Sequence, residues 1–257
     1  MRTQNRVLVL LVTTLLVSGD VSLLAGQAPD ASQLATAKRL ASDVAPDRRS
    51  ALEAARAIPV AQRGPELRAA LLTLLERQNA VGRDARSRSL PLDAVEDPEF
   101  VSAVQRTVAE MRDPATIPAL ASALGMFVLV RPLADFGEQA IPAVVDVVSS
   151  PSSRYSAVDD GLRVLRLIVE GASGPLSGRS RALLGDAART RLAGEQKFTT
   201  LWYAIDLAAV LGDADLTQTL RSLATDSGAV IARGVRTPRL VEQTRKRAAD
   251  RLAGVRP

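Results

Sequence analysis

The side chains most able to do chemistry in this chain are carboxylates and arginines, because its 257 residues include no cysteine and no histidine. Histidine is the commonest general base and metal ligand, and cysteine supplies thiol nucleophiles and disulfides. Their absence excludes a Ser-His triad, thiol catalysis, a disulfide framework and zinc sites built on cysteine. Enzyme chemistry would therefore have to use Asp, Glu and Arg.

Asp159 and Asp160 form one candidate pair of carboxylates. Adjacent residues of a helix point about 100° apart, so these two do not by themselves make the facing pair that a glycosidase needs. A pair assembled from distant helices stays open at this point.

Asp213 and Asp215 begin like a calcium-binding loop. Thr217 and Gln218, however, occupy positions where such a loop requires a ligand and a glycine. The simpler interpretation is a turn and a helix N-cap before Leu216. We therefore predict no metal site in this stretch.

Residues 171–180, rich in glycine and serine, are a candidate phosphate-binding loop. The P-loop pattern requires two glycines five positions apart, then Lys and Ser or Thr, after a strand. Here Ser173 replaces the first glycine, Arg179 replaces the lysine, and the preceding stretch has helical periodicity. The sequence also contains no Gly-x-Ser-x-Gly and no Ser-x-x-Lys motif. We expect no catalytic residue, no cofactor and no enzyme activity.

The elements that must position these side chains are helices. Residues 131–150 predict a helix that ends before Gly137 and a second helix that opens at Ile141-Pro142. The pattern recurs 24 residues earlier and 75 residues later, and the latter separation is about twice one helix pair of a helical-repeat protein. The earlier copy comprises Ile117, Pro118, Leu120 and Leu124, and the later one Leu211, Gly212, Leu216, Leu220 and Leu223.

Residues 113–124 and 207–216 resemble HEAT-like repeats, and the resemblance extends over about residues 113–226. Members of that family stack antiparallel helix pairs into a curved solenoid. The resemblance implies an all-α fold, a short right-handed α-solenoid with its repeats at 97–232. The apolar patterns along the chain predict about ten to twelve helices. Low aromatic content, 3 % of residues, also favours closely packed helices over a sandwich or barrel. The motif is structural and transfers no catalytic residue.

The first 28 residues are typical of a secretory signal. Arg2 and Arg6 precede an apolar run at 7–17, which is short for a membrane span. We expect an exported protein, periplasmic or secreted, with cleavage after 28 or after 19 and no nucleic-acid partner. The alternative is an uncleaved membrane anchor at 7–25, although Asp20 within it would cost about 2.5–3.5 kcal/mol near a helix centre. We expect no transmembrane span in the mature chain.

Residues 29–96 predict an N-terminal helix pair, at about 51–58 and 65–78, followed by a basic linker from 79 to 96. Arg83, Arg86 and Arg88 in this linker suggest either a solvated loop or a contact with a polyanion, and charge patterning favours the loop. Asp97-Pro98 then predicts an N-cap with proline at the first helical position.

The candidate interaction residues lie in the C-terminal third. Trp202 and Tyr203 could stack on a sugar or a peptide, although their helical spacing favours a structural role. Residues 233–257 hold eight Lys or Arg against two acids, and we predict a capping helix there. The alternative is a docking site for acidic protein, anionic lipid or cell-wall polymer, because we expect Arg239, Lys246 and Arg247 to point largely away from the protein. The basic candidates are Arg239, Arg245, Lys246, Arg247 and Arg251.

Two hypotheses of different class follow. The first is an exported, non-catalytic helical-repeat scaffold that binds a protein or peptide. The alternative is a binder of anionic cell-envelope polymer or lipid through the C-terminal basic helix. Ionic strength separates them, because attachment to a polyanion weakens steeply with salt and an apolar groove does not.

Overall fold

The computed structural model describes residues 30–87, 97–126 and 128–254. Within these residues the chain forms thirteen α-helices and no strand, which confirms the all-α class. The expected ten to twelve helices were too few because short helices such as α6 and α12 have little periodicity of their own. The helices are α1 Ala31–Leu40, α2 Ala45–Ala57, α3 Pro65–Ser87, α4 Pro98–Ala109, α5 Ile117–Ser122, α6 Val130–Ala134, α7 Ile141–Ser149, α8 Tyr155–Gly171, α9 Gly178–Ala193, α10 Phe198–Leu211, α11 Ala214–Thr225, α12 Ser227–Ile231 and α13 Pro238–Gly254.

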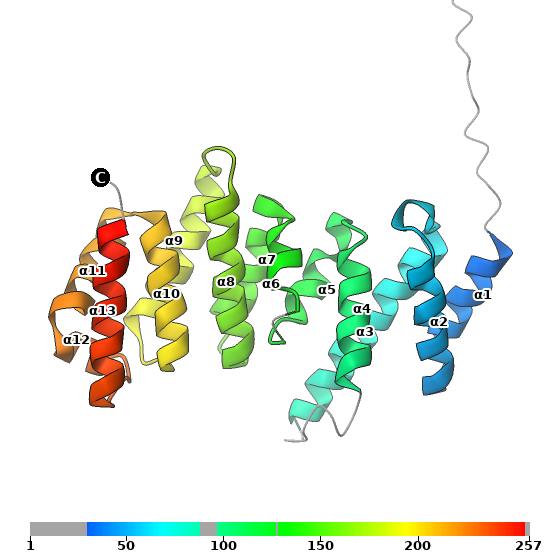
Figure 1. The fold of residues 1–257 in the computed structure, drawn as a ribbon, viewed down its shortest axis with the longest axis horizontal. Helices are drawn as coiled ribbons and strands as arrows, with labels where there is room; N and C mark the ends of the chain where they lie inside the picture. The colour runs from blue at the N-terminus through cyan, green and yellow to red at the C-terminus, as the bar shows by residue number, and fades with distance from the viewer. Residues whose placement is uncertain (1–29, 88–96, 127, 255–257) are drawn as a thin grey trace, which may run out of the picture.

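The helices are arranged in two rows (Figure 1). The helices α2, α4, α8, α10 and α13 stand side by side in the row nearer the viewer, and α3, α5, α7, α9 and α11 lie behind them. The short α6 belongs to the front row, because it contacts both α4 and α8. Each row therefore places next to one another helices that are separated in the sequence by one helix, or by two in the case of α10 and α13.

The core lies between the two rows. Front helices pack on back helices as the pairs α4 on α3, α8 on α7, α10 on α9 and α13 on α11. The apolar stripes predicted from the sequence face this interface, and their members are buried. They include Ile117 and Leu120 of α5, Ile141, Val144, Val145 and Val148 of α7, and Leu216, Leu220 and Leu223 of α11.

Capping and glycine residues set several helix ends. The carboxylate of Asp97 accepts a hydrogen bond from the Glu99 backbone N–H at 2.9 Å, which confirms the predicted N-cap of α4. Gly212 ends α10 with a φ of 65°, a left-handed conformation that glycine adopts without a Cβ clash. Gly137, predicted as a turn after the preceding helix, also has a positive φ, of 61°.

The predicted linker at 79–96 was wrong in its first part, because α3 continues to Ser87. The side chain of Asn79 donates a hydrogen bond of 2.9 Å to the backbone carbonyl of Ala119 on α5. This tertiary contact holds the C-terminal half of α3 against α5, and sequence periodicity does not report it. The rest of the linker lies outside the described residues, and so do the predicted signal segment 1–28 and Arg256.

No helix within the described segments is both long enough and apolar enough to span a lipid bilayer.

Candidate functional site

Trp202 contacts the C-terminal helix. Its indole N–H donates a hydrogen bond of 2.8 Å to the hydroxyl of Thr244 on α13. The Phe198 ring packs edge-on against the Trp202 ring, with 5.5 Å between the ring centres. The guanidinium of Arg247 lies 5.1 Å from the centre of the Trp202 ring. These contacts give the residue a structural role in joining α10 to α13, as its helical spacing favoured.

Tyr203, the second aromatic candidate, faces α8. Its ring is half-buried, and the guanidinium of Arg163 lies 5.7 Å from the ring centre. The two neighbouring aromatic residues therefore contact opposite neighbours of α10. They do not form one joint stacking surface.

Asp206 is the centre of a cluster that also contains Arg166, Arg247 and Arg251. Only 1 % of the Asp206 side chain is exposed. Its two carboxylate oxygens accept hydrogen bonds from all three arginines, with N–O distances between 2.5 and 3.2 Å. The bond to Asp206 raises the pKa of Arg251 above its ordinary value. The Asp206 cluster therefore joins α8, α10 and α13 through one buried carboxylate.

The expectation that Arg247 points away from the protein was wrong. The sequence pattern predicts a single apolar stripe as the buried face of α13. Arg247 follows Thr244 by three positions and Arg251 follows Arg247 by four, so all three lie on one side of the helix. That side faces α10, where Asp206 supplies the opposite charge. A buried counter-ion on another helix is a tertiary property that the local sequence of α13 does not carry.

The other basic candidates of α13 divide into two groups. Arg245 donates a hydrogen bond of 3.2 Å to the carbonyl of Ala224 and pairs with Glu242 at 3.1 Å. Arg239 and Lys246 are exposed and have no polar partner within the described part of the chain. Three of the five basic candidates thus contact other groups of the protein, and two face solvent.

Asp159 and Asp160 are both buried, and each has its own partner. Asp159 accepts a 2.5 Å hydrogen bond from the hydroxyl of Thr200, and Asp160 accepts a 3.2 Å hydrogen bond from the backbone N–H of Gly125. Arg163 lies 3.4 Å from the other oxygen of Asp160. The two carboxylates join α8 to different neighbours and do not share one site.

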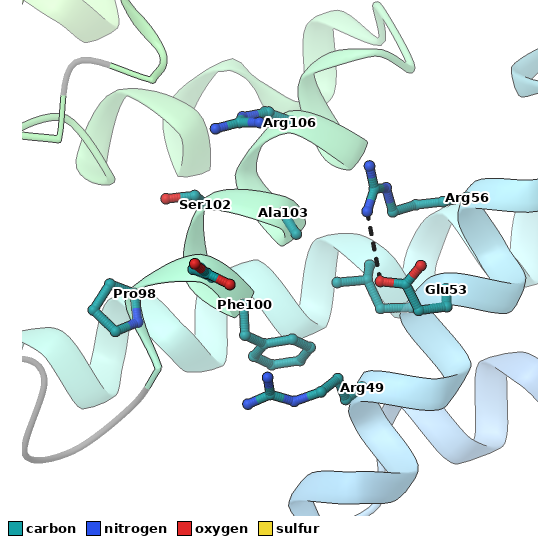
Figure 2. A pocket seen from close by; sticks show the side chains of 10 residues that line it. Arg49, Glu53, Arg56, Pro98, Phe100, Ser102, Ala103 and Arg106 are labelled. Carbon is teal, nitrogen blue, oxygen red and sulfur yellow. Dashed lines mark ion pairs between the residues drawn. The ribbon is translucent and has the colours of Figure 1, made fainter.

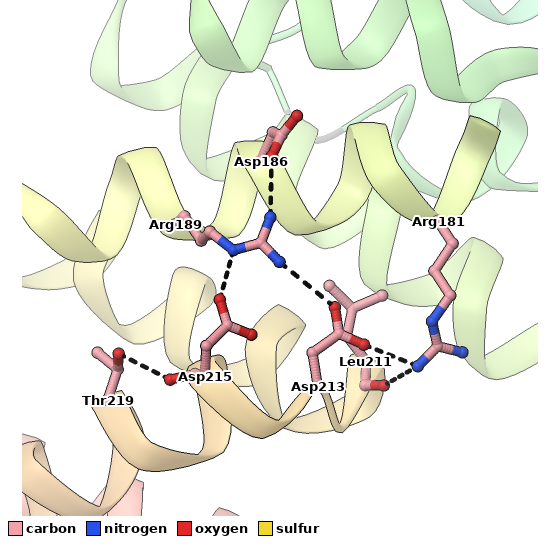
Figure 3. Close-up of polar contacts among 7 residues, drawn as sticks. All are labelled: Arg181, Asp186, Arg189, Leu211, Asp213, Asp215 and Thr219. Atoms are coloured by element: carbon pink, nitrogen blue, oxygen red, sulfur yellow. Dashed lines mark hydrogen bonds and ion pairs between the residues drawn. The ribbon is translucent and has the colours of Figure 1, made fainter. Parts of the chain in front are cut away.

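A second ion cluster lies on the back row, where Arg189 contacts three carboxylates (Figure 3). Its nitrogens lie 2.5 Å from Asp215, 2.8 Å from Asp186 and 3.8 Å from Asp213. Hydrogen bonding to Arg189 holds the pKa of Asp215 below its ordinary value. Asp213 occupies the N-cap position of α11, as predicted, but its side chain makes no capping bond and instead pairs with Arg181 at 2.8 Å.

Three adjoining hollows form a groove from α2 to α8, which we call the α2–α8 groove. The first hollow, about 500 Å³, lies between α2 and α4; the second, about 370 Å³, lies between the end of α4 and α6; the third, about 550 Å³, lies between α6 and the loop after α8. Arg106 lines both the first and the second hollow, and Asp135 lines both the second and the third. Neighbouring hollows of the α2–α8 groove therefore adjoin at a shared residue.

The first hollow is rich in arginine (Figure 2). Arg49 lies over the Phe100 ring at 5.7 Å and pairs with Asp97 at 2.7 Å, just outside the hollow. Arg56 pairs with Glu53 at 3.6 Å. Arg106 is exposed and has no ion-pair partner in the part of the chain that the structure describes. It is the cation of this hollow that is most available to a ligand.

The third hollow combines apolar walls with carboxylates. Half-buried Leu167 and Leu176 line it together with Asp135 and Glu138. The Glu138 carboxylate accepts a hydrogen bond of 3.1 Å from the Ser177 backbone N–H. Hydrogen bonds from Ser177 and Ser180 hold the pKa of Glu138 below its ordinary value, so this side chain stays ionised at neutral pH.

Sequence reasoning missed the α2–α8 groove. Its walls come from helices that are far apart in the chain, and no local pattern marks them. One signal was available: α2, α4 and α6 each carry an arginine in the last turn, namely Arg56, Arg106 and Arg131. Cations at these positions interact favourably with the helix dipole, and they also place positive charge along one edge of a row of helices.

Comparisons of the chain with models of protein families, with curated proteins and with solved structures found no match. Function is therefore inferred from the α2–α8 groove and the ion clusters themselves.

Proposed function

We propose that this protein is an exported, non-catalytic scaffold whose helix pairs stack as a HEAT-like, right-handed solenoid and hold an extended segment of a partner protein. The observation that carries the proposal is that the three hollows of the α2–α8 groove adjoin one another, at Arg106 and at Asp135. A compact small molecule would occupy one hollow. A groove that passes three boundaries between helices is better suited to an extended polypeptide segment.

The dimensions favour a short peptide segment. Packed helices lie about 8–10 Å apart, so the three steps from α2 to α8 span roughly 25–30 Å. An extended peptide advances about 3.3 Å per residue, so about eight or nine residues would fill the groove. Helical-repeat solenoids present extended concave surfaces that bind partners, which suits a segment of this length.

The chemistry of the groove supports binding more than catalysis. Its cations are arginines, which stay protonated and do not act as general bases. Three of its carboxylates already have ionic partners: Glu53 pairs with Arg56, Glu110 pairs with Arg63, and Asp135 pairs with Arg112 and Arg131. Such groups fix the orientation of a ligand, and none is positioned as an activated nucleophile.

Export rests on the sequence of residues 1–28 alone. The charged start and the short apolar run are those of a secretory signal, and the partner is therefore expected in the periplasm or outside the cell. We expect no nucleic-acid partner for the same reason.

The alternative function is attachment to an anionic cell-envelope polymer or lipid through α13. The observation that favours it is the exposure of Arg239 and Lys246. Against it, Arg245, Arg247 and Arg251 are engaged with other parts of the protein. Two free cations provide a weaker electrostatic contact than the five that the sequence suggested.

A steric block of the groove tests the proposal. The mature chain is used to select binders from a random peptide library, and the affinities of the selected peptides are then measured by fluorescence anisotropy. We expect Ala103→Trp in the first hollow and Ala134→Trp in the third to weaken binding by about 10-fold or more, because an indole would fill space that the ligand needs.

Ala193→Trp is the matched control, since Ala193 is exposed at the end of α9 in the back row. Circular dichroism verifies that all three variants fold. Equal affinities for the groove variants and the control would contradict the proposal. Loss of binding only in an Arg239→Glu, Lys246→Glu double variant would move the function to α13.

A further inference from the structure

Exposed apolar side chains gather at one edge of the front row. Five large apolar side chains among the described residues are at least 38 % exposed. Tyr155 and Phe198 are the first residues of α8 and α10, and Ile231 ends α12 shortly before α13. The other two are Leu34 on α1 and Val44, which precedes α2. The helices α8, α10 and α13 all begin at the lower edge of Figure 1, so three of the five belong to that edge.

Contacts between neighbouring segments hold this edge together. The Lys197 ammonium at the start of α10 lies 4.2 Å from the centre of the Tyr155 ring at the start of α8. The backbone N–H of Gln196 donates a hydrogen bond of 2.9 Å to the carbonyl of Arg233, which joins the loop before α10 to the loop before α13. Because packed helices lie about 8–10 Å apart, the three helix starts span roughly 16–20 Å. We call this surface the α8–α13 edge, and its segments are 154–155, 195–198 and 231–239.

The α8–α13 edge carries more positive than negative charge. Its segments contain five cations and one carboxylate, that of Glu195, which pairs with Arg236 at 3.2 Å. The guanidinium of Arg233 donates hydrogen bonds to the backbone carbonyls of Leu192 and Ala229. The other three cations are exposed and have no acidic partner within the described residues: Arg154, Lys197 and Arg239.

The surrounding acids do not cancel this charge. Six acids come next in the chain before or after the segments of the edge, and five of them have partners within the protein. These five are Asp159, Asp186, Asp206, Asp226 and Glu242. The sixth, Asp146, is exposed on α7 of the back row. Three free cations of the α8–α13 edge therefore stand against one free carboxylate on a neighbouring helix.

The starts of α8, α10 and α13 differ from those of the other long front helices. An acid in the first turn interacts favourably with the helix dipole, and α2 and α4 have Asp47 and Glu99 there. The first turns of α8, α10 and α13 contain no acid. The N-cap residues of α8 and α10 are Arg154 and Lys197, and neither makes a side-chain capping bond. Cations at these positions are unfavourable for the helices themselves, so helix stability does not account for them.

An anionic lipid surface fits this combination of side chains. Lysine and arginine are attracted to negatively charged headgroups. Exposed aromatic and aliphatic side chains gain free energy when they leave water for the boundary between headgroups and acyl chains. A soluble anionic polymer would match the cations of the edge but would leave its apolar side chains in water. The combination therefore favours a bilayer over a polymer.

We propose that the α8–α13 edge docks on the surface of an anionic lipid bilayer, with its free cations at the headgroups and with Tyr155 and Phe198 inserted between them. This inference goes beyond peptide binding and does not depend on it. The loop after α8 lies at the opposite end of that helix, so the third hollow of the α2–α8 groove stays away from the lipid (Figure 1). The surface also differs from α13 as a whole, because it shares only Arg239 with the basic candidates of that helix.

A fluorescent label tests insertion, because the chain has no native cysteine. The variants Tyr155→Cys and Ser173→Cys of the mature chain are each labelled with a polarity-sensitive nitrobenzoxadiazole dye. Ser173 is the control position, since it is exposed in the loop at the other end of α8. With vesicles of equal parts phosphatidylglycerol and phosphatidylcholine, the emission from position 155 should move to shorter wavelength and rise about 2-fold or more. The emission from position 173 should stay unchanged.

Charge reversal measures the electrostatic part of the binding. In the double variant Arg154→Glu, Lys197→Glu the helix dipoles favour the new acids, so the fold should be preserved. We expect this variant to bind the same vesicles about 10-fold more weakly or worse, because each cation near an anionic surface strengthens binding by about 5-fold. The matched control is Arg179→Glu, Lys246→Glu, which changes the net charge equally at exposed positions outside the α8–α13 edge and should keep most of the affinity.

A serine substitution measures the apolar part. Tyr155→Ser should weaken binding to the anionic vesicles by about 3- to 10-fold, and this loss should persist in high salt, where the electrostatic part is screened. Leu34→Ser is the matched control, because Leu34 is similarly exposed but lies on α1 at the far end of the chain. Circular dichroism verifies that every variant is folded.

Several results would overturn the proposal. It is wrong if vesicles of phosphatidylcholine alone bind as well as the anionic ones, if the two double variants lose affinity equally, or if the label at position 155 stays in water. Soluble polyphosphate is the competing probe. If it binds as tightly as the anionic vesicles and Tyr155→Ser has no effect on either, the occupant of the edge is an anionic polymer and not a bilayer.

Discussion

Arg247 of α13 binds both carboxylate oxygens of Asp206 on α10, through its Nε at 3.0 Å and its Nη2 at 2.5 Å. The same guanidinium lies against the Trp202 ring. One side chain of the C-terminal helix thus makes a two-point ionic contact and an aromatic contact with the preceding front-row helix. In the sequence, the basic tail suggested that it binds an anion outside the protein. In the structure, Arg247 of this tail binds the Asp206 carboxylate within the protein.

We predict that Asp206→Asn lowers the free energy of unfolding by about 3–5 kcal/mol, because three arginines would remain around a neutral, buried amide. Urea unfolding followed by circular dichroism measures this change. Asp250→Asn is the control, since Asp250 is exposed on α13 and should change stability by less than about 0.5 kcal/mol. Similar losses in the two variants would show that the Asp206 cluster contributes little.

The Trp202–Thr244 hydrogen bond should be measurable by itself. Thr244→Val removes the acceptor of the indole N–H and keeps the shape of the side chain, and we expect a loss of about 1–2 kcal/mol. Trp202 is the only tryptophan of the chain, so its fluorescence reports on the same contact. Thr219→Val, which removes an exposed hydroxyl bond on α11, is the control and should cost far less.

Gly212 should tolerate alanine poorly, although there is open space around it. Its φ of 65° is unfavourable for a residue with a Cβ, so Gly212→Ala should cost about 1–2 kcal/mol. Gly171→Ala is matched to it, because Gly171 also has open space but no positive φ. We expect the Gly171 variant to be stabilised by up to about 1 kcal/mol, and thermal unfolding of the two variants should therefore shift in opposite directions.

The Arg189 cluster should make stability sensitive to acid. The pKa of Asp215 is lower in the folded chain than in the unfolded one, so its contribution is present above the unfolded pKa and is lost as the pH falls through the folded pKa. Stability should therefore decrease as the pH falls below about 4. In the Asp215→Asn variant this decrease should be smaller, as measured by urea unfolding at pH 7 and pH 3.

A variant elsewhere calibrates that measurement. Asp113→Asn removes an exposed carboxylate that also accepts a hydrogen bond but has no arginine partner among the described contacts. If both variants lose the same share of the acid dependence, the ion pair with Arg189 is not its source.

The fold class was predictable because apolar periodicity is a local property. Ile141, Val144 and Val148 repeat at helical spacing, and the same spacing places them together in the core. The Asp97-Pro98 pair marked the start of α4 for a similar reason, since a cap involves only neighbouring residues. Such features need no knowledge of what lies across the interface.

The candidate site was predicted much less well, because it depends on contacts between distant residues. Arg247 was expected to point away from the protein, but it binds Asp206, which lies 41 positions earlier in the chain. Arg106 carried no signal beyond its place near a helix end, and its importance comes from the two hollows that meet there. Charge partners and grooves follow from the assembly of helices, which a single sequence does not display.

The Asp206 cluster also has a consequence for how the protein opens. Because the cluster ties three successive front helices to one carboxylate, α8, α10 and α13 should lose their structure in a single cooperative event. At the other end α1 packs mainly on α2 and α3, and it should open at much lower free energy. Amide hydrogen exchange should then be fast in the amino-terminal helices and slow in the carboxy-terminal unit. The amplitude of thermal motion would therefore decrease from α2 towards α8, the direction in which the groove runs.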